Sequence, residues 1–501
     1  MIYTNTRSVF PSFFYYVYLF FTFKLIYATI SLLNSCTYMN FKGGDLMSNL
    51  KAVILAAGKG TRMKSELPKV LHKIYDRCAI DYVCDACEGA GINDINIVVG
   101  HKADQVIEHV KKRNNHIKFC FQELQLGTGH AVMQAKNNIN DNDLVLVING
   151  DQPLISSKTI NSMISFCEQG NYGGVVLSGI VDHPGSLGRV IRDSKGNLER
   201  IVERKDCNED EERVKEVNIG VYCFKGKLLK DSFDKLDDNN AQNEYYITDI
   251  PVHIKKAGFN FGVCTIADMS EFQGINSREE LSLATCTLLN KTRKLHMANG
   301  VTLIDPSNTY ISIDAKIGKD TIIYPGTNIQ GETVIGENCI IGPNSHIISS
   351  KIGNNVTVET SKVTESSISD NCKIGPFAHI RPKCDIANNC KVGSFAETKN
   401  VTVGENTKIP HLIYTGDATI GKNVEIACGV ITANMNTKWE KNRTEIKDGA
   451  FVGCNSTLIA PITVGKDAVV GAGSVITKNV PDRALALERS NEIVKENYNN
   501  F

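Results

Sequence analysis

The sequence predicts an α/β, doubly wound (Rossmann-like) domain followed by a left-handed parallel β-helix of hexapeptide repeats. Short β-rich runs alternate with helix-length segments over residues 51–268, and beyond residue 310 aliphatic residues recur at intervals of six. With 501 residues, of which 42% are hydrophobic and 22% charged, the chain is long enough for several well-packed domains.

The overall composition excludes several functional classes. The 55 basic residues balance 55 acidic ones, which rules out a strongly basic nucleic-acid binder. Sixteen cysteines are scattered without a repeating framework, so we expect reduced thiols and a cytoplasmic protein. The single C-x-x-C pair, Cys84 and Cys87, is expected to pack within a helix rather than bind zinc. No nucleic-acid or membrane partner is expected.

Residues 1–46 differ in composition from the rest of the chain, because they hold 13 of its 36 aromatic residues. Residues 9–33 are long enough to cross a bilayer, but Lys24 interrupts them and no small-residue cleavage site follows. Residues 42–45 (KGGD) back-translate into a bacterial ribosome-binding site just before Met47. We therefore expect translation to start at Met47, with residues 1–46 untranslated or non-native. The N-terminal mass of the native protein tests this expectation.

The first domain is predicted from βαβ units. Strand-like runs at residues 52–57, 95–100, 144–150 and 173–180 are separated by helix-length segments, which is typical of a mainly parallel sheet. Such sheets bind ligands at the carboxyl ends of their strands. Ser277 followed by Glu280 has the pattern of a capping box and predicts a helix over residues 277–297. This helix either connects two domains or closes the first one.

The second domain is predicted from its period. Isoleucines are spaced six apart from Ile311 to Ile347, and the series resumes over residues 368–392 and 446–476. This period is typical of β-helices in which about eighteen residues form one triangular coil and the aliphatic side chain points inward. Interruptions near residues 394–413 and 431–445 predict loops that leave the coil. We expect a first domain at 48–273, a linker helix at 274–299 and the β-helix domain at 300–501.

A glycine-rich turn follows the first predicted strand, in the string LAAGKGTRM at residues 55–63. Backbone N–H groups of such a turn, together with Lys59, Arg62 and Lys69, suit a phosphate. The string is not a Walker A loop, and Met63 stands where a dinucleotide fingerprint has its third glycine. Followed by Pro68-Lys69, it resembles the signature of sugar-nucleotide pyrophosphorylases.

Three other segments add polar groups. Residues 122–131 contain amides suited to a nucleobase edge, and Asp151 follows a buried strand where its carboxylate would face the ligand crevice. Asn240 offers a second oxygen. Since Mg²⁺ takes one or two protein oxygens besides water and phosphates, Asp151 and Asn240 predict a magnesium site.

Over residues 48–489 these strings and repeats are similar to the bacterial bifunctional N-acetylglucosamine-1-phosphate uridylyltransferases/glucosamine-1-phosphate N-acetyltransferases. The resemblance implies acetyl transfer from acetyl-CoA to glucosamine 1-phosphate in the C-terminal domain. It implies uridylyl transfer from UTP to N-acetylglucosamine 1-phosphate in the N-terminal domain, and a homotrimer. The UTP and UDP-sugar site that it implies comprises Leu55, Ala56, Ala57, Gly58, Arg62, Lys69, Gln122, Gln125, Gly127, Thr128, Gly188, Glu203, Asn218 and Asn240.

By the same resemblance His411 is the general base toward the amine of glucosamine 1-phosphate, and Asn434 could orient it. The residues implied for the acceptor sugar phosphate are Arg381, Lys399, Tyr414 and Glu425. Those implied for acetyl-CoA are Cys428, Asn434, Met435, Cys454, Ala472 and Arg489. Glu425, Cys428 and Cys454 depart from the usual Asn, Ala and Ser of the family, and Asn149 stands where the family often has an aromatic residue.

Two alternatives stay open at this point. One is a monofunctional sugar-1-phosphate nucleotidyltransferase whose β-helix is only an oligomerisation scaffold. The departures at Glu425, Cys428 and Cys454 favour it. The residues that argue against it are His411, Lys399, Arg381 and Tyr414. The other is a membrane-tethered binding protein that uses residues 1–46, which leaves the phosphate and metal motifs unexplained.

Overall fold

The computed structural model describes residues 49–496 and 498. The aromatic segment 1–46 and the expected start at Met47 lie outside the described residues. Among the helices of the described part, none combines the length and the apolar character needed to cross a membrane.

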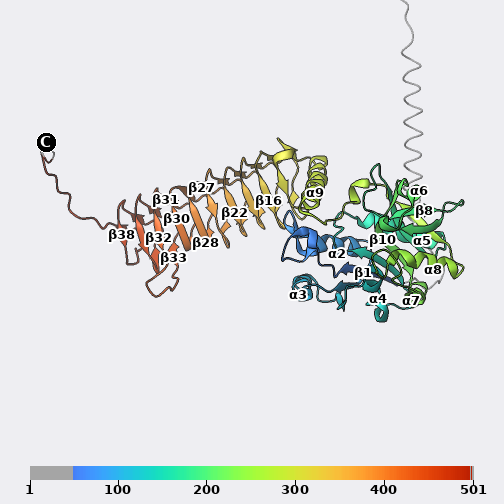
Figure 1. The fold of residues 1–501 in the computed structure, drawn as a ribbon. Helices are drawn as coiled ribbons and strands as arrows, with labels where there is room; N and C mark the ends of the chain where they lie inside the picture. The colour runs from blue at the N-terminus through green and yellow to red at the C-terminus, as the bar shows by residue number, and fades with distance from the viewer. Residues whose placement is uncertain (1–48, 497, 499–501) are drawn as a thin grey trace, which may run out of the picture. The chain divides into compact units, whose positions relative to one another are not determined.

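A nine-stranded sheet organises the first part of the described chain, and Figure 1 labels β1, β8 and β10 of this sheet. The strand order is β11-β7-β10-β6-β1-β4-β5, with β8 paired to β10 and β9 paired to β8. The strands β6, β1, β4 and β5 run parallel, whereas β10 runs antiparallel between β6 and β7. The strands of this sheet are β1 (Leu50–Ala56), β4 (Asp94–Val99), β5 (Lys118–Phe121), β6 (Leu144–Asn149), β7 (Gly174–Ile180), β8 (Arg189–Arg192), β9 (Leu198–Val202), β10 (Glu216–Lys225) and β11 (Phe261–Thr265). A separate hairpin joins β2 (Lys73–Ile74) and β3 (Arg77–Cys78).

Helices cover both faces of this sheet. Ala52 and Ile54 of β1 belong to one apolar cluster with residues of α2, α3 and α5, whereas Val53 belongs to a second cluster with residues of α4, α7 and α8. The doubly wound arrangement predicted from the sequence is therefore confirmed. The helices are α2 (Ala79–Gly89), α3 (Ala103–Arg113), α4 (Thr128–Met133), α5 (Ser157–Gln169), α6 (Glu209–Glu212), α7 (Gly226–Phe233), α8 (Ile250–Lys256) and α9 (Arg278–Ala298).

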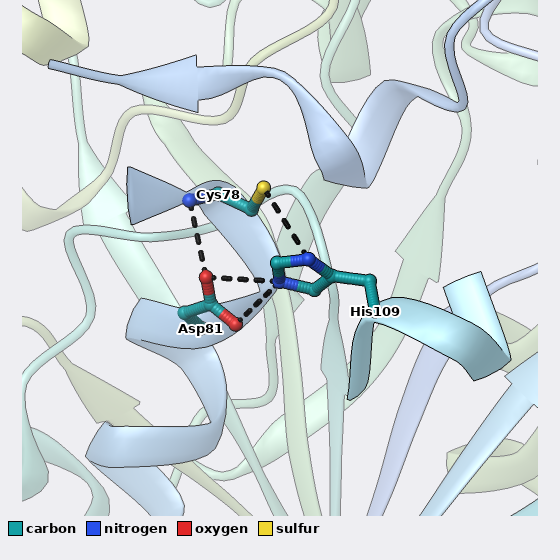
Figure 2. Close-up of side chains that lie close together, drawn as sticks. All are labelled: Cys78, Asp81 and His109. Carbon is teal, nitrogen blue, oxygen red and sulfur yellow. Dashed lines mark hydrogen bonds and ion pairs between the residues drawn. The ribbon is translucent and has the colours of Figure 1, made fainter. Parts of the chain in front are cut away.

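Cys78, Asp81 and His109 come together where α2 meets α3, and Figure 2 shows the imidazole ring between the thiol and the carboxylate. Nε2 of His109 lies 2.9 Å from Oδ1 of Asp81, while Nδ1 lies 4.0 Å from Sγ of Cys78. The two partners face different ring nitrogens, so the imidazole bridges the thiol and the carboxylate. Burial raises the pKa of Cys78 to about 11, and its thiol donates to the carbonyl of Leu71. This cluster therefore joins two helices. Cys84 and Cys87 are both buried on α2.

The predicted helix over residues 277–297 forms as α9. Oγ of Ser277 accepts a hydrogen bond from the Glu280 N–H at 3.1 Å, which caps the helix. The capping box is only half formed, because the Glu280 carboxylate accepts from the Asn276 N–H rather than from Ser277. Ala284 of α9 packs in an apolar cluster with Met63.

The hexapeptide repeats form the parallel β-helix that their period predicted. Ile311 pairs with Ile329 and Ile329 pairs with Ile347, so the same inward position stacks from coil to coil. One face of the coil is an eleven-stranded sheet. Its strands are β12 (Thr302–Leu303), β15 (Ile322–Ile323), β18 (Ile340–Ile341), β21 (Thr357–Val358), β24 (Lys373–Ile374), β27 (Lys391–Ser394), β29 (Lys408–His411), β31 (Glu425–Ile426), β34 (Phe451–Val452), β37 (Val469–Val470) and β39 (Leu485–Ala486).

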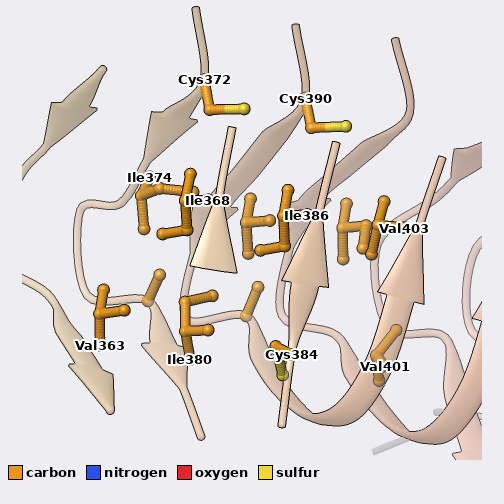
Figure 3. Close-up of a cluster of buried hydrophobic side chains, with 14 of the residues drawn as sticks. Val363, Ile368, Cys372, Ile374, Ile380, Cys384, Ile386, Cys390, Val401 and Val403 are labelled. Atoms are coloured by element: carbon orange, nitrogen blue, oxygen red, sulfur yellow. The ribbon is translucent and has the colours of Figure 1, made fainter. Parts of the chain in front are cut away.

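The other faces are connected in a seventeen-stranded sheet. Its strands are β13 (Tyr310–Ile311), β14 (Lys316–Ile317), β16 (Asn328–Gln330), β17 (Val334–Ile335), β19 (His346–Ile348), β20 (Lys351–Ile352), β22 (Lys362–Thr364), β23 (Ser367–Ile368), β25 (His379–Ile380), β26 (Asp385–Ile386), β28 (Glu397–Val403), β30 (Tyr414–Ile420), β32 (Ile431–Ala433), β33 (Thr444–Ile446), β35 (Thr457–Ile459), β36 (Ile462–Val464) and β38 (Val475–Ile476). Figure 3 shows the inward side chains of this region stacked in rows between the strands.

The predicted loop at residues 394–413 is wrong. Both β28 and β29 stay in the coil, and Thr398 pairs with Ile380 on one side and Thr415 on the other. The pattern lapses because fully buried threonines, Thr398 and Thr415, occupy the inward positions where the period expects an aliphatic residue. The second predicted loop is confirmed. Between β32 and β33 the chain leaves the coil in a turn closed by the Asn436 N–H donating to the Glu440 carbonyl.

Candidate active sites

The carboxyl ends of β1 and β6 open into a cavity of about 840 Å³. Its walls hold nearly every residue that the resemblance assigned to nucleotide and sugar, although these residues are spread over more than 160 positions of the chain. The predicted residues that line it are Leu55, Ala56, Ala57, Gly58, Arg62, Lys69, Gln122, Gln125, Gly127, Thr128, Asp151, Gly188, Glu203 and Asn218.

The glycine-rich turn packs closely against the lysine of the same motif. Gly60 has a φ of +61°, and a Cβ atom there would lie 2.8 Å from Cβ of Lys69. Only glycine combines this backbone conformation with so close an approach. The turn continues into a short 3₁₀ helix (Thr61–Met63) that carries the exposed Arg62. The loop thus brings two cations to one end of the cavity.

Lys69 and Asp151 form an ion pair inside the cavity. Asp151 is 8% exposed, and Nζ of Lys69 also donates to Oδ1 of Asn276 at 3.2 Å. The carbonyl of Asp151 accepts a hydrogen bond from the Ile275 N–H at 2.9 Å. Lys69 therefore holds the carboxylate of Asp151, and the Ile275 N–H holds its backbone.

The structure does not bring Asn240 together with Asp151. Oδ1 of Asn240 accepts from the backbone N–H groups of Gln242 and Glu244, and its Nδ2 donates to the Glu244 carbonyl at 2.6 Å. Such a bonded turn uses all polar atoms of the side chain locally. Asn240 lines a smaller cavity of about 380 Å³, of which Glu203 also forms a wall.

At the end of the cavity where the nucleobase is predicted to bind, two glutamine amides donate hydrogen bonds to backbone carbonyls. Nε2 of Gln122 donates to the Gly127 carbonyl at 3.1 Å, and Nε2 of Gln125 donates to the Ala57 carbonyl at 2.7 Å. Since a carbonyl can only accept, these contacts fix which end of each amide is the nitrogen. Oγ1 of Thr128 accepts from the Ile247 N–H at 3.2 Å, which anchors the start of α4.

At the predicted sugar end, Gly188, Glu203 and Asn218 converge. The Asn218 N–H donates to the Gly188 carbonyl at 2.9 Å, and a Cβ atom on Gly188 would lie 3.5 Å from the carboxylate oxygens of Glu203. Burial raises the pKa of Glu203, although Thr248 donates a hydrogen bond to its carboxylate. A methyl group at position 188 would therefore lie in ordinary van der Waals contact with the half-buried Glu203 carboxylate.

Sequence reasoning missed one wall of the cavity. It is built by the segment just before α9, far from the glycine-rich loop in the chain, together with the loop that precedes β8. The first of these segments contributes Phe272, Gln273, Gly274 and Asn276, and Glu280 follows in the first turn of α9. The capping signal at Ser277 marked the start of α9, but only the fold places the preceding residues beside Lys69.

In the β-helix, His411 and three predicted acetyl-CoA residues occupy the same corner of successive coils. His411 ends β29 and is exposed. The Asn455 N–H donates to the Cys428 carbonyl at 2.8 Å, and the Gly473 N–H donates to the Cys454 carbonyl at 2.7 Å. Cys428, Cys454 and Ala472 thus form one column along the β-helix. His411 lies at the start of this column, one coil before Cys428.

The predicted sugar-phosphate residues lie on two neighbouring faces of the coil. Arg381 pairs with Glu397 at 2.7 Å, and Glu397 is in register with Tyr414. Lys399 lies two residues farther along β28. Glu425 lies in the eleven-stranded sheet instead, where Nζ of Lys408 is 3.5 Å from its carboxylate.

The side-chain amide of Asn434 is bonded to Asp417 rather than to His411. Its Nδ2 donates to Oδ2 of Asp417 at 2.5 Å, because the end of β32 points it at the preceding coil. Burial alone would raise the pKa of Asp417, but hydrogen bonds from Asn400 and Asn434 lower it. Sequence reasoning left this buried carboxylate without a role.

The other two predicted acetyl-CoA residues are placed differently. Met435 begins the loop and pairs with Lys441 across it. Arg489 lies against Gly471, next to Ala472, since a Cβ atom on Gly471 would lie 3.0 Å from its guanidinium.

The first domain is a doubly wound sheet that carries a phosphate-binding type of loop and a carboxylate at a strand end. The second is a β-helix with an exposed histidine at a coil corner. Together these features define a two-domain transferase. Residues 52–200 match the family described as MobA-like NTP transferase domain. Residues 314–349, 365–400 and 443–478 match the family described as Bacterial transferase hexapeptide (six repeats).

Curated relatives match nearly the whole chain. Bifunctional protein GlmU of Clostridium kluyveri is 47% identical over 448 residues, which cover 89% of this chain and 97% of that protein. The proteins of the same name from Clostridioides difficile and Clostridium acetobutylicum are each 44% identical, with 97% of their length covered. The chain therefore belongs to the GlmU family of bifunctional proteins. It is an enzyme with uridylyltransferase and acetyltransferase activity, so the monofunctional alternative is not supported.

Proposed function

We propose that the chain makes UDP-N-acetylglucosamine, a cell-envelope precursor, in two steps. Residues 300–501 transfer acetyl from acetyl-CoA to glucosamine 1-phosphate, residues 48–273 transfer uridylyl from UTP to N-acetylglucosamine 1-phosphate, and residues 274–299 link them. The observation that carries the proposal is that thirteen of the fourteen residues expected at the UTP and UDP-sugar site line one cavity together with Asp151.

Uridylyl transfer joins two anions, because the sugar phosphate attacks the α-phosphorus of UTP in line. Positioning and charge neutralisation are therefore the main tasks of the protein, and no protein nucleophile is needed. Lys69 and Arg62 supply positive charge beside backbone N–H groups of the turn at residues 57–60. Gln122 and Gln125 hold the uracil and ribose side, while Gly188, Glu203 and Asn218 hold the sugar.

The residues present fit a magnesium ion in part. Asp151 offers a carboxylate within the cavity, whereas Asn240 would have to leave its bonded turn to join it. A divalent ion with one protein carboxylate and several water or phosphate oxygens is typical of Mg²⁺. When bound, Mg²⁺ supplies positive charge that neutralises the triphosphate.

Acetyl transfer requires an amine that has lost a proton. The exposed imidazole of His411 suits a base that accepts this proton at a ring nitrogen. Arg381, Lys399 and Tyr414 bind the sugar phosphate. The column of coil corners from Cys428 to Ala472, with Arg489 beside it, holds acetyl-CoA.

We also propose that the enzyme is a cytoplasmic homotrimer. Phe377 and Phe395 stack with ring centroids 5.2 Å apart while remaining more than half exposed, and the exposed Leu412 follows His411. This apolar strip beside the acetyl site suits a contact with a neighbouring subunit. Sedimentation of a stable monomer with full acetyl activity would contradict the trimer.

The decisive assay supplies the protein with glucosamine 1-phosphate, acetyl-CoA, UTP and Mg²⁺. Free thiol reports acetyl transfer and pyrophosphate reports uridylyl transfer. Both products are expected, and omitting acetyl-CoA should remove pyrophosphate until N-acetylglucosamine 1-phosphate is added. Release of pyrophosphate without thiol when all substrates are present would contradict the two-step order.

A further inference from the structure

Two cysteines occupy equivalent positions on adjacent coils of the β-helix. Glu425 pairs with Phe451 and Ile426 pairs with Val452, so the register continues to Cys428 opposite Cys454. The Asn455 N–H donates to the Cys428 carbonyl at 2.8 Å, which confirms this register at the corner. The residue after each cysteine has a left-handed φ, so both side chains leave the same kind of corner.

This spacing suits a disulfide. Neighbouring strands lie about 4.8 Å apart, and disulfides join Cα atoms roughly 4.4–6.8 Å apart. The same β-helix holds a second in-register pair of cysteines. Cys372 and Cys390 lie on adjacent coils and point the same way (Figure 3), and each thiol donates to a backbone carbonyl at 3.1 Å, Cys372 to Ala387 and Cys390 to Gly404.

The two cysteine pairs differ in access to solvent. Cys372 and Cys390 are buried, whereas Cys428 is half-buried and Cys454 is exposed. An oxidant dissolved in water can therefore reach the corner pair but not the core pair. Access and thiol pairing together are what distinguish oxidation-sensitive cysteines from structural ones.

We propose that Cys428 and Cys454 are an oxidation site. A hydroperoxide oxidises the two thiols to a reversible disulfide between these cysteines. The Cys454 thiolate attacks a peroxide oxygen, the O–O bond breaks, and an alcohol or water leaves, which gives a sulfenic acid. The Cys428 thiolate then attacks that sulfur, the S–O bond breaks, and hydroxide leaves as water after taking a proton. Two thiols are oxidised and one peroxide is reduced, so atoms and electrons balance.

The disulfide blocks the acetyl site, an effect that rests on the proposed function. Both sulfur atoms belong to the column that holds acetyl-CoA, and His411 lies one coil before Cys428. Joining the sulfur atoms draws this corner together where the thioester has to lie. Acetyl transfer falls roughly tenfold or more, as expected when reacting groups are displaced by about an ångström. Uridylyl transfer is unchanged because its cavity contains neither cysteine.

The disulfide is tested directly by mass spectrometry of the full chain. The protein is treated with hydrogen peroxide, alkylated with iodoacetamide without reductant, and digested. The expected product is a peptide pair cross-linked through Cys428 and Cys454 that dithiothreitol separates, while Cys372 and Cys390 stay free of a cross-link. Alkylation of both corner cysteines after peroxide, or a sulfinic acid at Cys454 beside an alkylated Cys428, overturns the proposal.

The functional effect is tested with Cys454→Ser and with Cys286→Ser, which removes an exposed cysteine on α9 as a control. Each protein is compared with its own reduced form. Peroxide should lower acetyl transfer in the wild type and in Cys286→Ser, but not in Cys454→Ser, and dithiothreitol should restore it. Equal loss in Cys454→Ser, or a cross-link that leaves acetyl transfer unchanged, overturns the blockage. Absence of acetyl transfer in the reduced wild type refutes the proposed function instead, and the cross-link assay still decides the disulfide.

Discussion

The ammonium group of Lys69 forms an ion pair with the carboxylate of Asp151, a residue 82 positions away in the chain. Lys69 belongs to the loop proposed to hold phosphate, and Asp151 is the proposed ligand for Mg²⁺. Because each side chain satisfies the other, a nucleotide must compete with Asp151 for the lysine, and a cation must compete with Lys69 for the carboxylate. We therefore expect nucleotide and cation to bind together more tightly than either binds alone.

Asp151→Asn should lower uridylyl transfer by about 10³-fold or more, because the amide keeps the shape but loses the charge. Acetyl transfer should stay near the wild-type rate, since its residues lie in the β-helix. Pyrophosphate and thiol release measure the two reactions. Asp182→Asn, which removes an exposed acid paired with Lys215, is the matched control. Normal pyrophosphate release by Asp151→Asn would refute its role.

Asn276→Ala should raise the KM for UTP roughly fivefold with a smaller change in kcat. The variant removes one hydrogen bond to the Lys69 ammonium, and such a bond contributes about 1 kcal/mol. Steady-state kinetics at saturating sugar phosphate measure the effect. Asn299→Ala, at the other end of α9, should leave the KM unchanged. An equal rise of the KM for UTP in both variants would contradict a specific role of the Asn276 hydrogen bond to Lys69.

His411→Ala should lower acetyl transfer by about 10²–10⁴-fold, because the attacking amine loses its base. Uridylyl transfer measured with N-acetylglucosamine 1-phosphate should be unaffected. His346→Ala provides the control, since this histidine is likewise exposed on a strand of the β-helix. Retention of the wild-type acetyl rate in His411→Ala would place the base elsewhere.

Ile374→Ala should lower the free energy of unfolding by about 2–5 kcal/mol, because it leaves a cavity in the inward stack. Ile340→Ala, whose side chain is 43% exposed on β18 of the same sheet, should change it by only about 0.5 kcal/mol. Urea unfolding followed by circular dichroism compares the two. Similar losses in both variants would contradict the inward stacking of every sixth residue.

Asp249→Asn should stabilise the protein more at about pH 7.5 than at about pH 4. Burial, followed by the nearby Asp237 and Asp206, raises the pKa of Asp249 to about 6, whereas an unfolded aspartate titrates near 3.9. The folded chain therefore holds the proton more tightly. The stability that this proton provides is complete below about pH 4 and is lost as the pH rises through about 6. Asp210→Asn, an exposed acid, should show no such pH dependence.

The residues that repeat along the chain made the fold predictable. The period of six predicted the β-helix, because each inward position packs on the same position one coil away. The strand-like runs predicted the doubly wound sheet. The prediction failed at Thr398 and Thr415, where small polar side chains fill inward positions and hide the coil from a pattern of aliphatic residues. Met47 and the segment before it stay a prediction about the start of translation.

The kind of chemistry was predictable from local strings of restricted residue types, which contain the glycine-rich turn, Lys69, Asp151 and His411. Which of these groups meet depends on the packed fold. In the folded chain the Asn240 side chain is hydrogen-bonded within its own loop. The Asn434 amide donates to Asp417, and Lys69 donates to Asn276. The physical reason is that a hydrogen bond or ion pair requires atoms within about 3 Å, and for residues far apart in the chain that distance is set by packing rather than by local sequence.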